Sequence, residues 1–81
     1  MEKYENLVRN LFLPLVMHPD DLVVKTLSDQ DGITTLQVLV HADDLGRVIG
    51  KGGRVANAVR TIAYAGAARR GRKVRIDIDS F

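Results

Sequence analysis

The sequence predicts an α+β domain whose elements follow the order helix, strand, strand, helix, helix, strand. Three observations carry this prediction. Apolar residues near the beginning of the chain recur with helical spacing, two aliphatic runs lie on either side of an Asp-Gly pair, and the last run alternates between apolar and polar residues. A chain of 81 residues is long enough for one such domain, so we expect residues 1–81 to form a single unit.

The first half of the chain predicts a helix followed by a hairpin. Apolar side chains from residue 2 to about residue 13 follow the i, i+3/i+4, i+7 spacing of an amphipathic helix, and Pro14 and Pro19 mark its end. Mostly aliphatic or β-branched residues at 22–27 and 33–41 predict two strands. Residues 28–32 supply a turn that ends in Asp-Gly, so an antiparallel pairing of the two strands is the simplest arrangement.

The second half predicts two helices around a glycine-rich loop and then a strand. Asp43 and Asp44 fall where a helix N-terminus favours acidic side chains, and a short helix extends from there to about Ile49. A second helix follows from Arg54 to about Ala68. Residues 73–79 are apolar at every second position, which predicts a half-buried strand.

Composition excludes several classes of protein. The chain has no cysteine, so it has no disulfide framework, no Cys-ligated zinc and no thiol nucleophile. The longest apolar run, residues 11–17, contains a proline and is far shorter than the roughly 20 residues that span a bilayer. Acidic and basic residues are mixed at the N-terminus, unlike a signal peptide. We therefore expect a cytoplasmic protein that does not associate with a membrane.

Charge is divided unevenly along the chain. Residues 1–45 carry three basic and eight acidic residues, a net charge of −5. Residues 46–81 carry nine basic and two acidic residues, a net charge of +7. This asymmetry indicates a face for a polyanion in the second half, although basic side chains also solvate ordinary surfaces.

The segment 45–54, LGRVIGKGGR, carries most of the chemical information. Glycines in its loop allow backbone conformations that other residues rarely adopt, and they let a ligand come close to the main chain. The loop opens into a helix whose first N–H groups lack intrahelical acceptors, which favours an anion such as phosphate. Lys51 and Arg54 add cations, and Arg47 lies one turn before the loop.

Three glycine-rich patterns compete with a purely geometric helix–loop–helix turn. The P-loop pattern fails because Gly46 and Gly50 are too close and Gly52 stands where Ser or Thr should bind magnesium. The dinucleotide pattern GxGxxG fails on glycine spacing and because a helix, not a strand, precedes the loop. The third pattern, GxxG between two helices, clamps nucleic-acid backbone in KH domains.

Residues 48–54, VIGKGGR, resemble the VIGxxGR signature of KH domains, and the predicted strand–helix–helix–strand core at about 33–79 matches the KH core. The helix and strand before it, at about 2–27, resemble the type II arrangement of bacterial KH proteins. More narrowly, the whole chain is similar to the small single-KH RNA-binding proteins of the bacterial KhpA (YlqC) type. The shared features are the Pro19-Asp20-Asp21 turn, the run 43–50 and the helix at Arg60-Thr61 that leads to a basic end. Gly52 departs from relatives, which often carry a polar residue there.

The resemblance implies a three-stranded sheet with three helices on one face and a groove that binds about four nucleotides of single-stranded RNA. Carried over by position, the residues expected to contact RNA phosphates are Gly50, Lys51, Gly52 and Gly53. Those expected to form the apolar floor are Val48, Ile49 and Val55, with Arg47 and Arg54 as flanking cations. Strand residues near Arg75 are expected to present backbone groups to base edges. The arginines at 69–72 either extend the RNA path or complement a helix C-terminus.

The resemblance also implies a non-catalytic role as an RNA chaperone or post-transcriptional regulator. Relatives form homodimers and pair with a larger KH-containing RNA-binding protein linked to cell elongation and division. The alternative is therefore a protein–protein assembly module, with the aliphatic and alanine-rich helices as its interface and RNA binding as a secondary property.

No residue set in the sequence indicates catalysis, a cofactor or a metal. His18 precedes a proline and His41 ends a predicted strand, and neither has a partner at ligand-like spacing. The pair Asp43 and Asp44 is explained by a helix N-terminus, and no nucleophile, base and orienting residue occur together.

Overall fold

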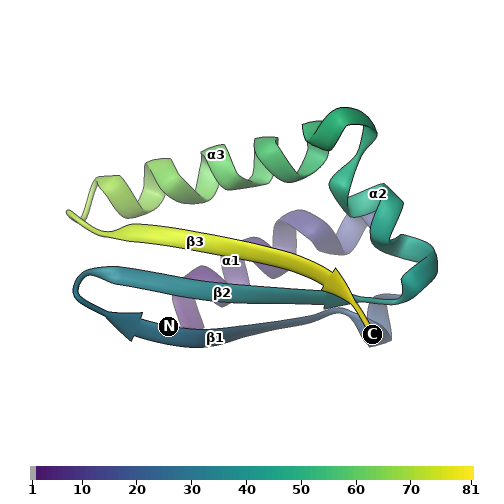
Figure 1. Cartoon of the computed structure of the whole chain (residues 1–81), viewed down its shortest axis with the longest axis horizontal. Helices are drawn as coiled ribbons and strands as arrows, with labels where there is room; N and C mark the ends of the chain where they lie inside the picture. The colour runs from purple at the N-terminus through teal and green to yellow at the C-terminus, as the bar shows by residue number, and fades with distance from the viewer. Residues whose placement is uncertain (1) are drawn as a thin grey trace.

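The computed structural model describes residues 2–81, and Met1, which the predicted domain includes, lies outside them. The described helices and strands are α1 (Glu2–Phe12), β1 (Val23–Gln30), β2 (Ile33–Val40), α2 (Leu45–Ile49), α3 (Arg54–Ala68) and β3 (Lys73–Ser80). Short 3-10 turns occupy Leu13–Leu15, Pro19–Asp21, Ala42–Asp44 and Lys51–Gly53. The α+β class and the element order predicted from the sequence are confirmed (Figure 1).

The sheet has the order β1-β2-β3 and is mixed. β1 and β2 pair antiparallel from Val23 opposite Leu39 to Gln30 opposite Ile33, which confirms the predicted hairpin. β2 and β3 pair in parallel, so the helices α2 and α3 form the crossover between them. β3 is consequently an edge strand with one free side.

The hairpin turn is tighter than the sequence suggested. We expected turn residues from 28 to 32, but β1 continues to Gln30 with an irregularity between Thr26 and Ser28. Only Asp31 and Gly32 remain between the strands, with φ angles of +56° and +76°. Positive φ at both central residues is the condition for the type I′ turn that Asp-Gly favours, and its twist matches that of the flanking strands. Pairing with β2 therefore outweighs the turn-forming tendency of the polar residues that precede it.

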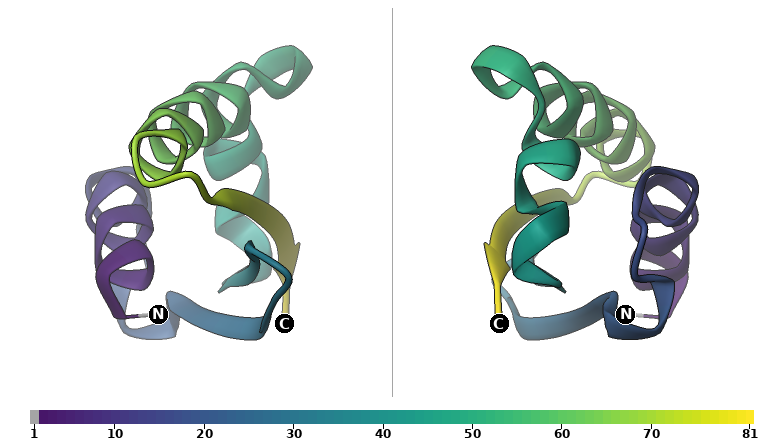
Figure 2. Two further views of the ribbon diagram at one scale, coloured as in Figure 1. Left: turned by 90° about the vertical axis from the view of Figure 1, so that its left-hand side faces the viewer. Right: turned by 90° about the vertical axis from the view of Figure 1, so that its right-hand side faces the viewer.

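All three helices lie on the same side of the curved sheet, as expected (Figure 2). β2 alternates accordingly, with Thr34, Leu36, Val38 and Val40 buried and the intervening side chains more exposed. Apolar residues of α1, α3 and β3 complete one continuous core; its fully buried members include Val8, Phe12, Ala63 and Ala67. Small alanines on α3 let the helix approach the sheet closely. No helix in residues 2–81 is both long enough and apolar enough to cross a membrane.

Candidate nucleic-acid interface

The loop Gly50–Gly53 connects α2 to α3 and turns the chain sharply between them (Figure 1). Gly50, Gly52 and Gly53 have φ angles of +77°, +64° and +80°. Gly50 combines its φ with a ψ of 168°, a region that is essentially restricted to glycine. Three glycines in four positions therefore satisfy three separate conformational requirements of this turn.

Gly50 is also required by packing. A Cβ placed on it would lie 2.5 Å from Val55 Cγ2 and 2.9 Å from the backbone nitrogen of Val55. By contrast, a Cβ on Gly52 would meet nothing within 4 Å. Gly50 thus allows the first turn of α3 to pack against the end of α2, whereas Gly52 faces open space.

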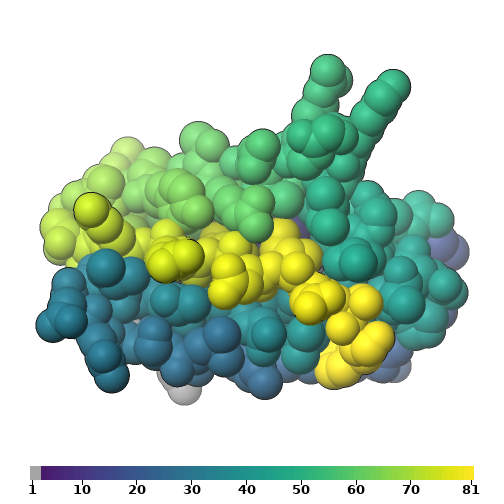
Figure 3. All heavy atoms as spheres, viewed as in Figure 1, coloured from purple at the N-terminus to yellow at the C-terminus, as the bar shows by residue number. Residues whose placement is uncertain are grey.

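Backbone amides and cations gather at this turn. The Gly53 N–H donates to Gly50 O (3.0 Å), whereas the N–H groups of Lys51 and Gly52 have no backbone acceptor within residues 2–81. Lys51 and Arg54 are exposed, and long side chains from this part of the chain project beyond the rest of the surface in Figure 3. The loop leads directly into the 15-residue helix α3, and the positive N-terminal end of the helix dipole adds to the positive potential at the loop. The arrangement suits an anion that is held by N–H groups and nearby cations.

The residues expected to form the apolar floor lie at different depths. Ile49 and Val55 are half-buried beside the loop. Val48 is fully buried within the core and offers no surface to a base, so it supports the floor from beneath. The sequence could not separate Val48 from Ile49, because both are β-branched apolar residues on one short helix.

Arg47 is exposed on α2, with Nε 3.8 Å from Asp44 Oδ1. Arg75 lies elsewhere, on β3, and its side chain is exposed. The N–H of Lys73 donates to Gly32 O on the β2 side, so odd-numbered residues of β3 direct their backbone groups into the sheet. The N–H and C=O of Arg75 therefore pair with β2, and along β3 only the even-numbered residues can present backbone groups at the free edge.

One of those edge groups already has a partner. The Arg60 guanidinium on α3 donates from Nη2 (3.0 Å) and Nε (3.3 Å) to Ile76 O. The next even-numbered residue toward α2 is Ile78, which is half-buried and whose N–H and C=O have no hydrogen-bond partner outside the sheet within residues 2–81. Sequence reasoning did not single out Ile78, because its edge position follows from the strand order.

The arginines at 69–72 lie at the opposite end of α3 from the loop (Figure 1). A 15-residue helix is about 22 Å long. Within the cluster, Arg72 Nη2 bonds Asp29 Oδ1 and lies 3.1 Å from Thr34 Oγ1. Arg72 therefore ties the start of β3 to the hairpin, which leaves Arg69 and Arg70 as the freely exposed members of this cluster.

Asp44 has a structural role that the sequence did not reveal. It lies at a helix N-terminus, as predicted, since it is the N-cap residue of α2. Its side chain makes no cap hydrogen bond to α2, however, and its carboxylate is fully buried at the end of the preceding 3-10 turn. Its two oxygens accept hydrogen bonds from the N–H groups of Met17 and His18, both at 2.9 Å. Burial alone would raise the pKa of Asp44, but these bonds and the nearby His18 and Arg47 outweigh it and hold the pKa below its ordinary value.

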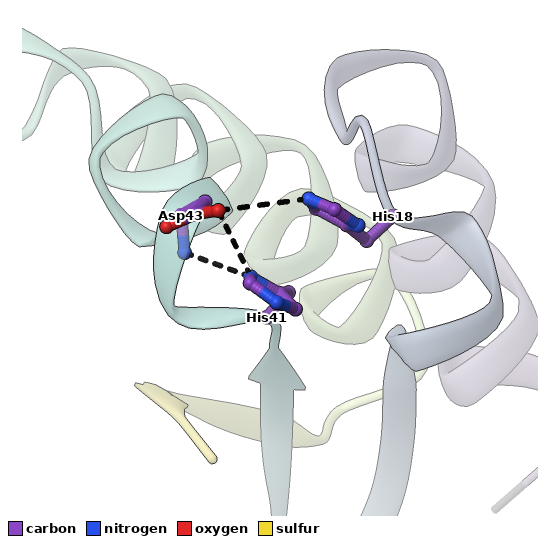
Figure 4. Close-up of side chains that lie close together, drawn as sticks. All are labelled: His18, His41 and Asp43. Atoms are coloured by element: carbon purple, nitrogen blue, oxygen red, sulfur yellow. Dashed lines mark hydrogen bonds and ion pairs between the residues drawn. The ribbon is translucent and has the colours of Figure 1, made fainter.

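His18 and His41, 23 positions apart in the sequence, are neighbours in the structure. Their rings stack with centroids 3.9 Å apart, and both approach Asp43 (Figure 4). His41 Nδ1 also accepts the N–H of Asp43 at 3.0 Å. The sequence shows no partner at ligand-like spacing for either histidine, and the structure supplies the partners through the fold of the segment between them.

The chain belongs to the KhpA/KhpB KH-domain family, whose sequence model matches residues 5–78. It is 42% identical over 74 residues to the RNA-binding protein KhpA of Listeria monocytogenes, which covers 91% of this chain and 96% of that protein. Over 75 residues it is 41% identical to KhpA of Bacillus subtilis, covering 91% and 90% of the two chains. Over 78 residues it is 42% identical to KhpA of Mycobacterium bovis, covering 96% and 88%.

Solved structures show the same fold in a larger protein. A crystal structure of Aquifex aeolicus Era superposes with a TM-score of 0.70 at 18% identity, covering 96% of this chain and 30% of that one. A structure of Era with nucleotides 1506–1542 of 16S ribosomal RNA gives the same TM-score and identity, covering 95% and 29%. The chain thus corresponds to under a third of Era, and the likeness concerns the fold alone.

Proposed function

We propose that this protein binds single-stranded RNA without catalysing a reaction, and that the loop Gly50–Gly53 clamps the RNA backbone. The observation that carries the proposal is the pair of N–H groups at Lys51 and Gly52, which have no backbone acceptor within residues 2–81 and lie beside the exposed cations Lys51 and Arg54 at the start of α3. Phosphate is the anion that such a site binds most readily. Relatives named as RNA-binding proteins over nearly their whole length support the same assignment.

The bases would lie beside the loop, toward the free edge of β3. Ile49 and Val55 offer apolar surface there, and Ile78 offers an edge N–H and C=O for hydrogen bonds to bases. Ile76 O already accepts a hydrogen bond from Arg60, so Arg60 limits the groove on the side away from α2. A groove of this size suits about four nucleotides, as is typical of KH domains.

Affinity should be modest and sensitive to salt. Three cations near the loop, Arg47, Lys51 and Arg54, allow at most about three phosphate contacts, which predicts a slope of log K against log salt of about −2 for single-stranded RNA. Such binding fits an RNA chaperone or post-transcriptional regulator in the cytoplasm, which meets many RNAs and releases them readily.

The test is fluorescence anisotropy of labelled single-stranded RNA with the parent protein and with Lys51→Asp/Gly52→Asp. Aspartate is tolerated better than most residues at positive φ, and Gly52 faces open space, so the variant should fold. We expect at least a tenfold loss of affinity, because two negative charges replace a cation and lie beside the phosphate site.

The matched control is Arg70→Asp/Ser28→Asp, which lowers the net charge by the same three units at two exposed positions away from the loop. This control should bind RNA within about threefold of the parent at moderate salt, because distant charges are screened beyond roughly 10 Å. Equal losses in both variants would contradict a clamp at the loop and would indicate binding through net charge. A loss only in the control would move the site to the arginine cluster.

A second candidate function, pairing with another KH-type protein, is favoured by the outer side of α3. Ile62 is exposed there at 49%, among small residues such as Ala58 and Ala65, whereas Tyr64, exposed at 42%, lies two positions further on and so on the other flank of the helix. A helix with small and apolar outer positions allows close packing of a second helix. Both a second copy of this chain and a larger KH-containing protein, as expected from the resemblance, would fit this description.

Ile62→Asp tests the pairing, with Leu27→Asp as the control, because Leu27 is a similarly exposed apolar residue (51%) on β1, away from α3. If the outer side of α3 is an interface, the first variant should shift sedimentation toward the monomer more than the second. The RNA affinity of one isolated domain should change little, because neither residue adjoins the loop. A monomeric parent protein at high concentration, with no partner, would contradict self-pairing and leave RNA binding unaffected.

A further inference from the structure

We propose that His18, His41 and Asp43 form a binding site for a divalent transition-metal ion, with zinc as the cation that their chemistry suits best. The three residues lie near the N-terminal end of α2, outside the loop that the proposed function uses (Figure 4). Two imidazoles and one carboxylate are common zinc ligands, with water completing the coordination.

The separations of the candidate ligand atoms approach those of a zinc site. Asp43 Oδ2 lies 3.8 Å from His18 Nε2 and 3.6 Å from His41 Nδ1. All three ligand atoms lie within 4.8 Å of one another. Zinc bonds of about 2.0–2.1 Å in tetrahedral geometry place two ligand atoms about 3.3 Å apart. Movements below about 1.5 Å would therefore bring the set to coordination distance.

The backbone that carries the ligands is already held in place. The buried carboxylate of Asp44 accepts the N–H of His18 and of its neighbour Met17, so the two segments are joined directly beside the site. His41 follows the last residue of β2, and Asp43 lies two positions further on. The protein thus brings together ligands from two segments before any ion binds, and this lowers the ordering cost of binding.

The side chains can complete the geometry by small rotations. The imidazole rings are stacked at 18° to each other and must turn so that both lone pairs point to one ion. Their side chains are partly exposed, at 42% and 38%, and that of Asp43 is 76% exposed, so there is open space for these rotations, which replace the ring stack by bonds to the ion. His41 Nδ1 would exchange its hydrogen bond from the Asp43 N–H for the metal, and that N–H would turn to water.

The test is titration of the untagged protein with zinc chloride, followed by calorimetry and by NMR of the imidazole groups. The chain has two histidines and no cysteine, so every imidazole signal can be assigned to one of the proposed ligands. We expect one equivalent of zinc per chain, both imidazoles shifting together, and a rise in the midpoint of thermal unfolding that depends on zinc concentration.

Asp43→Asn, His18→Gln and His41→Gln should each weaken zinc binding at least tenfold. Asp77→Asn is the control, because it removes the same charge from an exposed strand position away from the site. An unchanged affinity in Asp43→Asn, or a shift of only one imidazole, would overturn the proposal. Restored binding in a mixture of His18→Gln and His41→Gln chains would also overturn it, since the ion would then bridge two molecules.

Discussion

Replacing Gly50 by alanine tests the turn between α2 and α3 at the glycine with the closest contacts. The φ of +77° and ψ of 168° lie in a region that costs a residue with a side chain about 1–3 kcal/mol. The new Cβ would also approach Val55 Cγ2 to 2.5 Å and the Val55 backbone nitrogen to 2.9 Å. Overpacking of this kind costs about 1–3 kcal/mol.

Together the two effects predict that Gly50→Ala lowers the free energy of unfolding by about 2–6 kcal/mol. For a domain of this size, each 1 kcal/mol lowers the melting temperature by about 4–8 °C. Gly52→Ala is the matched control, because its φ of +64° is unfavourable for alanine but its Cβ would meet no atom within 4 Å. It should cost only about 1–2 kcal/mol.

Urea unfolding followed by circular dichroism measures both changes, and a double variant separates the two causes. Val55→Ala in the Gly50→Ala background removes the Cγ2 contact but keeps the contact with the backbone nitrogen, so it should recover only part of the loss. A Gly50→Ala variant no more destabilised than Gly52→Ala would contradict a packing requirement at Gly50, and full recovery in the double variant would contradict a contribution from its backbone conformation.

Three further predictions concern the scaffold around the site. Asp44→Asn should lower stability at neutral pH and flatten its decline in acid, since a lowered carboxylate pKa stabilises the fold above about pH 4 and that contribution disappears as pH falls through the folded-state pKa. Urea unfolding at several pH values measures this, and parallel curves for parent and variant would contradict it. Arg60→Met should cost about 1 kcal/mol by leaving Ile76 O without its donor, as measured by urea unfolding against Arg69→Met. Asp31→Asn should be neutral within about 0.5 kcal/mol, whereas Asp31→Val should cost more than 1 kcal/mol at its φ of +56°, and equal thermal midpoints would contradict this.

Regular periodicity allowed most of the fold to be predicted. The bounds of α3 were predicted correctly, because a glycine loop precedes it and its apolar spacing persists to Ala68. β1 was predicted too short, since the polar residues 28–30 look like a turn when considered alone. They extend the strand because β2 supplies their hydrogen-bonding partners, and a local pattern does not contain that information.

The candidate site was predictable where its chemistry is local. The glycine loop and its cations occupy consecutive positions, so sequence spacing was sufficient to propose an anion site. The free edge at Ile78 and the hydrogen bonds of Asp44 depend on strand order and on segments more than 20 residues apart. The stacking of His18 on His41 depends on the same long-range packing. None of these three features has a signal in the spacing of nearby residues.

The most direct test of RNA binding at the loop is a map of amide chemical shifts during titration with a short single-stranded RNA. We predict that the largest changes occur at Lys51, Gly52 and the first turn of α3, followed by Ile78 on the edge of β3. Changes concentrated at residues 69–72, with the loop amides unmoved, would contradict it.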